Sequence, residues 1–453
     1  MKNALRNRKT RSSNPRLLAL DMLERWKETE LDWHERVDSL APRDRALVRQ
    51  LVSGTLRWQG KIDYYLNFFL RTDSPELPLR VMNILRMAVF QLKFCDRIPD
   101  YAVVNESVKL AKTASRSRHS GLVNGVLRNL IRNWDEVSLP RADDNPGYYL
   151  AVEYSHPEWL VTRYIRRFGL DFTRSLLEAN NTQAPLVLRF DGALAGRTGE
   201  IIEFRQKMEG EGLRVEVGKY LPEALVIAGN PPRPSYLPGF EEGLFYIQDE
   251  AAMLVAHLAA PNPGDLIFDL CAAPGGKTTH LARLAGKSSF IVASDLSRER
   301  IRKLRNNICR LGLANTALVA GDALWPALKE ADLAICDVPC TGTGVLRRKP
   351  ELRWRVNEED LARLAELQKK ILEACADTVA PGGTLIYSTC SLEPEENWGI
   401  VSYFLSRRDD FYLEPADRYL EKELVSQQGC LETFPNVHGI DGAFAARLKR
   451  KAE

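Results

Sequence analysis

Two cysteines stand where a thiol could take part in chemistry. Cys340 closes Asp337-Val338-Pro339-Cys340 and Cys390 lies in Ser388-Thr389-Cys390-Ser391, each after a short apolar run that predicts a strand. A free cysteine is more often a small core residue than a nucleophile. The core interpretation fits the cysteines inside predicted helices or strands, which are Cys95, Cys309, Cys336 and Cys375. At strand ends beside a ligand crevice, Cys340 and Cys390 are instead predicted to be reactive.

The stretch from Asp269 to Thr278 predicts a strand that runs through a glycine turn into a helix. Glycines let a ligand approach the backbone, and the helix N-terminus offers free N–H groups. We expect this turn to hold a nucleotide-like group through Cys271, Ala272, Ala273, Pro274, Gly275, Gly276 and Lys277.

Acids follow the next predicted strands. Asp295 suits hydrogen bonds to ribose hydroxyls, Asp322 suits the adenine amino group, and Asp337 follows the fourth strand. A phosphate-binding P-loop fits less well, because its first glycine would fall on Cys271 and Pro274 lacks an N–H. The turn also lacks the Gly-x-Gly-x-x-Gly of a dinucleotide site. S-adenosylmethionine, an adenosyl compound without a triphosphate, is therefore the expected cofactor.

A thiolate beside a methyl donor suits methylation of cytosine at carbon 5. Addition of the thiolate to carbon 6 turns carbon 5 into an enamine carbon that accepts the methyl group. Asp337 could assist at ring nitrogen N3, and Cys340 could serve product release. Glu393 to Glu396 after Ser391 predict the first turn of a helix whose dipole favours a Cys390 thiolate, although the glutamates oppose this in part. The residues alone leave open which thiol attacks first.

The elements that must position these groups fall into three predicted domains. Residues 1–140 carry apolar residues at helical spacing, as in the stripe Leu17, Leu20, Leu23 and Trp26, and predict an all-helical domain. Residues 141–240 follow a Pro- and Asp-rich linker and predict a small α/β domain, with a helix at Pro157 to Ala179 and strands at 185–190, 213–217 and 224–227. Residues 241–453 alternate strands and helices, which predicts a doubly wound parallel sheet with a Rossmann-like fold.

From the composition we expect a cytoplasmic protein. The first fifteen residues lack an apolar signal core, and no apolar run is long enough for a membrane span. The eight cysteines include no Cys-x-x-Cys pair, so we expect reduced thiols and no metal. Net charge is only +3, but six cations precede the first acid: Lys2, Arg6, Arg8, Lys9, Arg11 and Arg16.

A second basic cluster follows Cys340. Arg347-Arg348-Lys349 and Arg353-Trp354-Arg355 combine cations with an aromatic ring, which suits phosphate contacts and base stacking on single-stranded RNA. The alternative for this cluster is a loop whose cations are simply solvated. For the basic N-terminal residues, the alternative is a solvated tail. A non-catalytic RNA-binding factor is the rival to the enzyme.

Taken together, the glycine turn and the two cysteine motifs resemble the RNA 5-methylcytosine methyltransferases of the NOL/NOP/Sun family. The stretches Tyr101 to Glu106 and Gly121 to Arg128 resemble the NusB-like RNA-binding domain of its bacterial RsmB (Sun/Fmu) subgroup. The resemblance implies a monomer acting on 16S rRNA, free or in an assembly intermediate. It also implies that Cys390 is the nucleophile, that Cys340 assists release, and that the turn, Asp295, Asp322 and Asp337 contact the cofactor.

Overall fold

The computed structural model describes residues 14–27, 37, 40–70, 77–114, 119–192, 198–229 and 231–452. Contacts divide the chain into two compact units. The first comprises Met1–Asn181 and Lys349–Arg355, and the second comprises Thr182–Arg348 and Val356–Glu453. This division is coarser than the three predicted domains, whose boundaries stay predictions. Of the basic N-terminal residues, only Arg16 lies within the described part.

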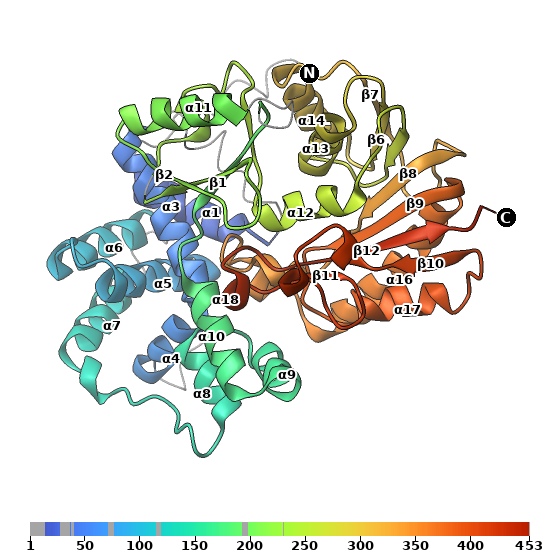
Figure 1. Cartoon of the computed structure of the whole chain (residues 1–453). Helices are drawn as coiled ribbons and strands as arrows, with labels where there is room; N and C mark the ends of the chain where they lie inside the picture. The colour runs from blue at the N-terminus through green and yellow to red at the C-terminus, as the bar shows by residue number, and fades with distance from the viewer. Residues whose placement is uncertain are drawn as a thin grey trace, which may run out of the picture. The chain divides into compact units, whose positions relative to one another are not determined.

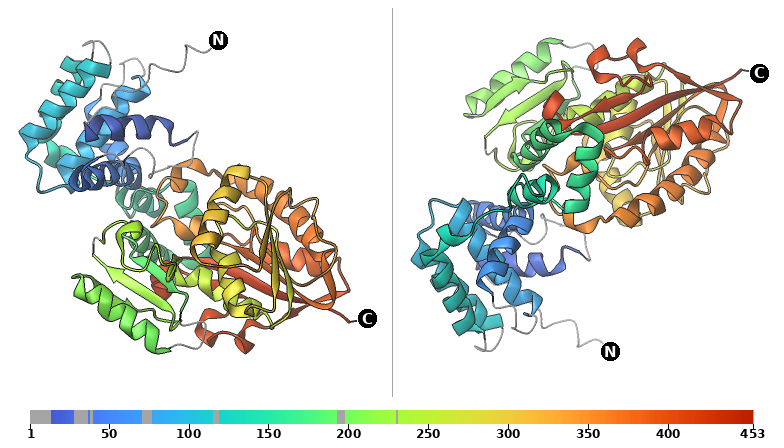
Figure 2. Two further views of the ribbon diagram at one scale, coloured as in Figure 1. Left: turned by 90° about the horizontal axis from the view of Figure 1, so that it is seen from above. Right: turned by 90° about the horizontal axis from the view of Figure 1, so that it is seen from below.

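The first unit is helical throughout its described residues (Figures 1 and 2). Asn14 caps its first helix by accepting hydrogen bonds from the N–H groups of Arg16 and Leu17. The helices are α1 (Pro15–Arg25), α3 (Pro42–Arg57), α4 (Gln59–Phe69), α5 (Leu79–Phe94), α6 (Asp100–Ala114), α7 (Ser120–Arg132), α8 (Pro146–Glu153), α9 (Glu158–Phe168), α10 (Leu170–Asn181) and α15 (Leu352–Arg355).

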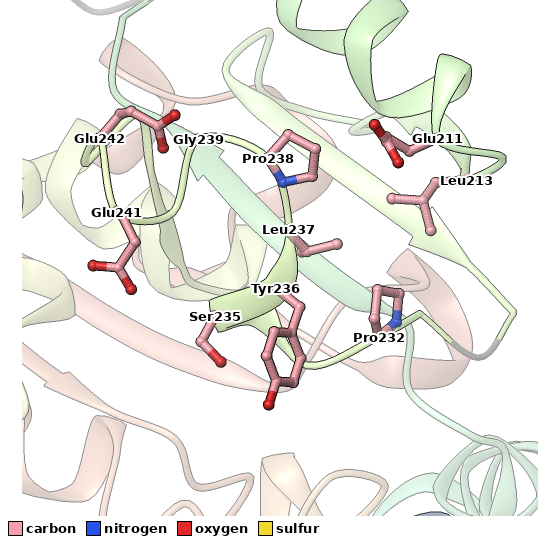
Figure 3. Close-up of a pocket in the computed structure, with 10 residues that line it drawn as sticks. All are labelled: Glu211, Leu213, Pro232, Ser235, Tyr236, Leu237, Pro238, Gly239, Glu241 and Glu242. Atoms are coloured by element: carbon pink, nitrogen blue, oxygen red, sulfur yellow. The ribbon is translucent and has the colours of Figure 1, made fainter. Parts of the chain in front are cut away.

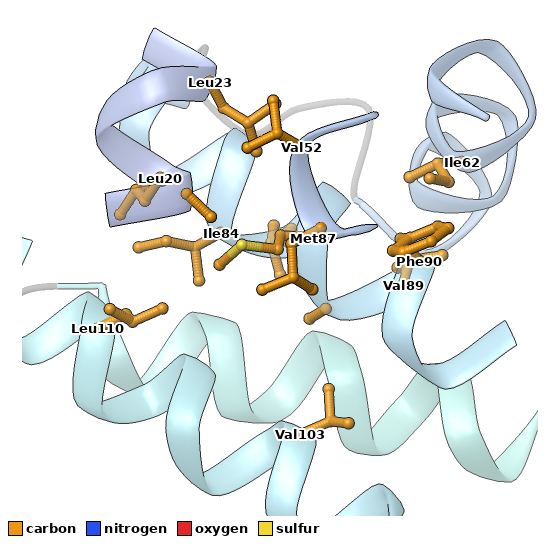
Figure 4. Close-up of a cluster of buried hydrophobic side chains, with 14 of the residues drawn as sticks. Leu20, Leu23, Val52, Ile62, Ile84, Met87, Val89, Phe90, Val103 and Leu110 are labelled. Atoms are coloured by element: carbon orange, nitrogen blue, oxygen red, sulfur yellow. The ribbon is translucent and has the colours of Figure 1, made fainter. Parts of the chain in front are cut away.

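The predicted apolar stripe lies in the core of this unit. Leu20 and Leu23 of α1 are buried in one cluster with Val52, Ile84 and Met87 (Figure 4). The all-helical prediction is confirmed for the described residues. Each buried leucine contributes roughly 1.5–3 kcal/mol relative to an exposed one.

One predicted helix is in fact two. Gly169 has φ +82°, a left-handed conformation that ends α9, and α10 begins at the next residue. The prediction of a single helix over Pro157 to Ala179 was therefore wrong. Glycine is well suited to such a helix end because it has no Cβ.

An antiparallel four-stranded sheet opens the second unit. Its strands are β1 (Leu186–Phe190), β2 (Arg214–Val217), β3 (Ala224–Ala228) and β4 (Phe245–Ile247), in the order β2-β3-β1-β4. Helix α11 (Thr198–Gly210) packs on it through Phe204, whose ring stacks on Phe190 with centroids 4.9 Å apart. The three predicted strands are confirmed, and β4 is additional.

The larger sheet has eight strands. Five are parallel, in the order β9-β8-β5-β6-β7: β5 (Leu266–Asp269), β6 (Phe290–Asp295), β7 (Thr316–Ala320), β8 (Ala331–Asp337) and β9 (Val379–Thr389). The predicted doubly wound arrangement is confirmed for these. The sheet is mixed, however, because β12 (Ala443–Arg450) pairs antiparallel with β9. Strands β10 (Phe411–Glu414) and β11 (Leu431–Thr433) in turn pair antiparallel with β12.

Helices cover both faces of this sheet (Figures 1 and 2). Ile267 packs with α12 (Glu250–Ala259) and α13 (Gly276–Ala285), whereas Phe268, which points to the opposite face, packs with α16 (Glu358–Ala376) and α17 (Trp398–Leu405). The remaining helices are α14 (Arg298–Arg310), α18 (Pro435–His438) and the 3-10 helices η1 (Trp134–Glu136), η3 (Pro234–Tyr236), η4 (Thr343–Val345), η5 (Ala416–Arg418) and η6 (Lys422–Leu424). No helix among the described residues has the length and apolar composition needed to cross a membrane.

Candidate active site

The predicted acids lie at the carboxyl ends of neighbouring parallel strands. Asp269, Asp295 and Asp337 are the last residues of β5, β6 and β8, and Asp322 follows β7. Strand β5 pairs with both β6 and β8, so the strand order reverses there. Ligands of doubly wound sheets bind in the crevice at such a switch point.

The turn between β5 and α13 requires glycine at position 275. Gly275 has φ +109°, and a Cβ there would lie 2.3 Å from the side chain of Leu304. The turn is also fastened to two strands. The hydroxyl of Thr278 donates to Asp269 Oδ2 at 2.6 Å, and the N–H of Ala273 donates to Asp295 Oδ2 at 3.1 Å. Burial raises the pKa of Asp269 to about 7.

Two exposed apolar side chains adjoin the strand-end acids. Leu296 follows Asp295 and is 74% exposed, while Trp325 lies shortly after Asp322 and is 81% exposed. Sequence reasoning missed both, because nothing in the sequence marks them as exposed. They give this edge of the sheet apolar surface for a flat ring such as adenine.

Lys277 and Asp337 form an ion pair at this edge, with Nζ 2.7 Å from Oδ2. Ser388 at the end of β9 donates to Asp337 Oδ1 at 2.8 Å. Burial by itself would lower the pKa of Lys277, but attraction to Asp337 raises that pKa above its usual value. A charged ammonium therefore stands beside the carboxylate.

The two predicted thiols are brought together by β8 and β9. Cys340 Sγ lies 3.3 Å from Cys390 Sγ, and both side chains are partly exposed and not joined by a disulfide bond. The hydrogen bond to Cys390, followed by burial, raises the pKa of Cys340 well above its usual value. Cys340 therefore holds its proton at neutral pH. Of the cysteines assigned to the core, Cys95, Cys336 and Cys375 are buried, but Cys309 is exposed on α14.

A buried carboxylate joins the two cysteine segments. Glu396 is fully buried and accepts hydrogen bonds from the N–H of Thr341 at 2.9 Å and from the Ser391 hydroxyl at 2.5 Å. The Thr341 hydroxyl also donates to it. Because Thr341 follows Cys340 and Ser391 follows Cys390, one side chain fixes both segments.

The helix predicted to begin at Glu393 does not start there. Residues 394–397 form a turn, and α17 begins only at Trp398. The Ser391 hydroxyl accepts from the N–H of Glu393 at 3.0 Å, which resembles a cap locally but leads into no helix. The prediction that a helix dipole at this position favours a Cys390 thiolate was therefore wrong.

The basic loop after Cys340 is used inside the protein. Arg347 donates to Asp441 Oδ1 at 2.7 Å, and Arg348 donates to Asp441 Oδ2 at 2.5 Å. Within the first unit, the buried Arg353 donates to Asn181 Oδ1 at 2.7 Å. Internal acceptors hold all three arginines, and because Arg347 and Arg353 are also buried, the prediction that they contact RNA was wrong for those two.

The neighbouring Trp354 is also held inside the first unit. Its indole N–H donates to the carbonyl of Leu56 at 2.6 Å, and its ring packs against the helical core. Base stacking on this ring is therefore not supported. Lys349 is the exposed cation of the loop.

A pocket in the second unit lies outside this constellation (Figure 3). It contains none of the predicted site residues, and three of the residues that line it are glutamates. The lining comprises Glu211, Leu213, Pro232, Ser235, Tyr236, Leu237, Pro238, Gly239, Glu241 and Glu242.

Known proteins match the chain along nearly its whole length. A family model described as 16S rRNA methyltransferase RsmB/F matches residues 256–449, a NusB family model matches 13–132, and a ferredoxin-like domain of RsmF/B-like methyltransferases matches 156–232. The probable ribosomal RNA small subunit methyltransferase B of Synechocystis sp. is 35% identical over 91% of this chain and 92% of the relative. The chain belongs to the ribosomal RNA small subunit methyltransferase B family.

Other comparisons agree with membership of this family. Ribosomal RNA small subunit methyltransferase B of Proteus mirabilis is 34% identical over 91% of this chain and 92% of its own length. The crystal structure of PH0851 has a TM-score of 0.82 at 26% identity and covers 97% of this chain and 98% of that chain. NSun6 from Pyrococcus horikoshii, solved with SFG, has a TM-score of 0.58 at 25% identity and covers 66% of this chain and 98% of that chain.

The family confirms the predicted fold class and activity. The NusB-like helical domain and the Rossmann-like methyltransferase domain are confirmed, and the predicted small α/β domain is ferredoxin-like. The chain is an S-adenosylmethionine-dependent rRNA methyltransferase. The roles of individual site residues stay predictions.

Proposed function

We propose that this enzyme methylates carbon 5 of a cytosine in 16S rRNA, with Cys390 as the nucleophile. The observation that carries the proposal is the 3.3 Å separation of Cys340 Sγ and Cys390 Sγ beside the Lys277–Asp337 ion pair. One thiol can then attack while the other assists, within reach of a carboxylate and an ammonium.

The residues at the strand ends suit S-adenosylmethionine. The Cys271 to Lys277 turn gives the cofactor close backbone approach, and Asp295 and Asp322 offer carboxylates for ribose hydroxyls and the adenine amino group. Exposed Leu296 and Trp325 supply apolar surface for the ring. When bound, the cofactor supplies an electrophilic methyl group.

The chain's own groups prepare the cytosine. Thiolate addition from Cys390 to carbon 6 places electron density on carbon 5, the carbon to be methylated. In the proposed step Asp337 carries a proton, which Lys277 can supply across their 2.7 Å contact, and donates it in a hydrogen bond to ring nitrogen N3, which stabilises the charge that addition creates. After carbon 5 has been methylated, a base takes the carbon 5 proton and the C6–S bond breaks with its electron pair returning to the Cys390 sulfur. Cys340 is placed to assist that release.

The choice of 16S rRNA rests on the relatives. Their names specify the small-subunit RNA, and the NusB match supplies a further RNA-binding domain. We propose that a monomer acts in the cytoplasm on free 16S rRNA or on an assembly intermediate. Methylation of another RNA is the second candidate.

The test measures methyl transfer from S-adenosylmethionine to unmethylated 16S rRNA, 23S rRNA and tRNA, with nucleoside analysis of each product. We expect 5-methylcytosine in 16S rRNA alone. Cys309→Ala, which changes an exposed cysteine on α14, is the control and retains activity. 5-Methylcytosine in another RNA would overturn the substrate assignment, and no methylated base at all would favour a non-catalytic binding factor.

A further inference from the structure

Three potential metal ligands converge away from the proposed active site. Glu223, His257 and His280 each offer one ligand atom, and these atoms lie within 4.8 Å of one another. Glu223 precedes β3, His257 lies on α12 and His280 lies on α13. Because the three belong to different elements, no short sequence spacing predicts them.

His280 is the residue that needs a partner. It is fully buried, and among the described residues neither of its ring nitrogens has a hydrogen-bond partner. Its Nε2 lies 3.5 Å from Glu223 Oε1, on the side where His257 also approaches. A buried polar atom without a partner destabilises the folded state, so a ligand that satisfies it would stabilise the fold.

The spacing suits a tetrahedral ion. Bonds of about 2.0–2.1 Å to zinc separate neighbouring ligand atoms by about 3.4 Å, close to the 3.5 Å between His280 Nε2 and Glu223 Oε1. His257 Nε2 lies 2.5 Å from the same oxygen, a direct hydrogen bond that an ion would replace after a small outward movement of the partly exposed ring.

The electrostatic surroundings are compatible with a cation. Glu223 is almost completely buried and contributes the negative charge. The positive charge of Arg189 also reaches His280, but Arg189 is paired with a carboxylate, its Nε lying 2.7 Å from Asp191 Oδ1.

We propose that Glu223, His257 and His280 bind a divalent transition-metal ion of the zinc class. Two imidazoles and one carboxylate are a common ligand set for zinc, and the exposed side of His257 leaves room for a fourth ligand from solvent. The ion ties the four-stranded sheet, through the residue before β3, to α12 and α13 of the larger sheet. Since α13 begins at the glycine turn, the ion also holds that turn in place.

The test titrates the chelator-treated full-length protein with Co²⁺ and records the visible absorption of tetrahedral cobalt. We expect about one equivalent bound by the wild type, and a higher melting temperature with the metal than without it. His257→Gln keeps a hydrogen-bond donor to Glu223 but removes an imidazole ligand, so it should lose both effects. His119→Gln, a histidine of the first unit, is the matched control and should keep them.

The cysteine pair could also bind cobalt, and its signature differs. Thiolate ligands add a charge-transfer band in the near ultraviolet, which the proposed site does not produce. Absence of cobalt uptake by the wild type would overturn the proposal whatever the variants do. Equal uptake by His257→Gln, or uptake lost on replacing Cys340 and Cys390 with serine, would also overturn it.

Discussion

Cys340 Sγ and Cys390 Sγ lie 3.3 Å apart, about 1.3 Å more than a disulfide bond length. A small movement of the two segments would therefore join the thiols. Both side chains are partly exposed, so a small oxidant can reach them.

We predict that a disulfide reagent such as oxidised glutathione inactivates the enzyme. Thiol–disulfide exchange would form a Cys340–Cys390 disulfide and release two molecules of reduced glutathione. Peptide mass analysis should show the cross-link, and dithiothreitol should restore activity. Cys309→Ala should oxidise in the same way, while an inactivated wild type with no such cross-link would contradict this account.

Glu396→Gln should loosen both cysteine segments. The amide replaces one acceptor oxygen with a donor, which then faces the N–H of Thr341 or the hydroxyls of Thr341 and Ser391. We expect a loss of about 2 kcal/mol in the free energy of unfolding and a fall in kcat larger than any change in KM.

The control for this variant is Glu395→Gln, a change at the exposed neighbouring position. It should leave urea unfolding and kcat close to the wild-type values. A Glu396→Gln enzyme with unchanged kcat would show that the two segments do not need this carboxylate.

Asp269 predicts a pH dependence of stability. Its pKa of about 7 in the folded protein exceeds the unfolded value of about 4, because the carboxyl group is buried. Asp337 raises this pKa further, whereas Lys277 and the hydrogen bond from Thr278 act to lower it. Between about pH 4 and about pH 7 the folded state holds a proton that the unfolded state has lost, so the free energy of unfolding falls as pH rises.

The comparison is between wild type and Asp269→Asn, whose amide oxygen still accepts from Thr278. From about pH 5.5 to about pH 7.5, the melting temperature of the wild type should fall relative to that of the variant. Parallel curves for the two proteins would contradict the raised pKa.

Local patterns predicted most of the site. Short apolar runs that end in Asp269, Asp295 and Asp337 mark strands directly, and parallel strands bring such ends to one edge. The same logic predicts that Cys340 and Cys390 lie near each other, as they do. The reactive geometry was therefore largely predictable.

Contacts between distant residues could not be predicted in this way. Strand β12 pairs with β9 across more than fifty residues, so the mixed part of the sheet has no local signal. Arg347 appears as one more surface cation in the sequence, and only its contact with Asp441 reveals a structural role. The Glu396 contacts and the cluster around His280 are hidden for the same reason.

The most direct test of the covalent mechanism compares Cys390→Ala with Cys340→Ala on unmethylated 16S rRNA and S-adenosylmethionine. If Cys390 attacks and Cys340 assists release, Cys390→Ala forms neither 5-methylcytosine nor a covalent complex. Cys340→Ala then accumulates a protein–RNA adduct that survives a denaturing gel. An adduct formed by Cys390→Ala, or wild-type activity in either variant, would contradict the assignment.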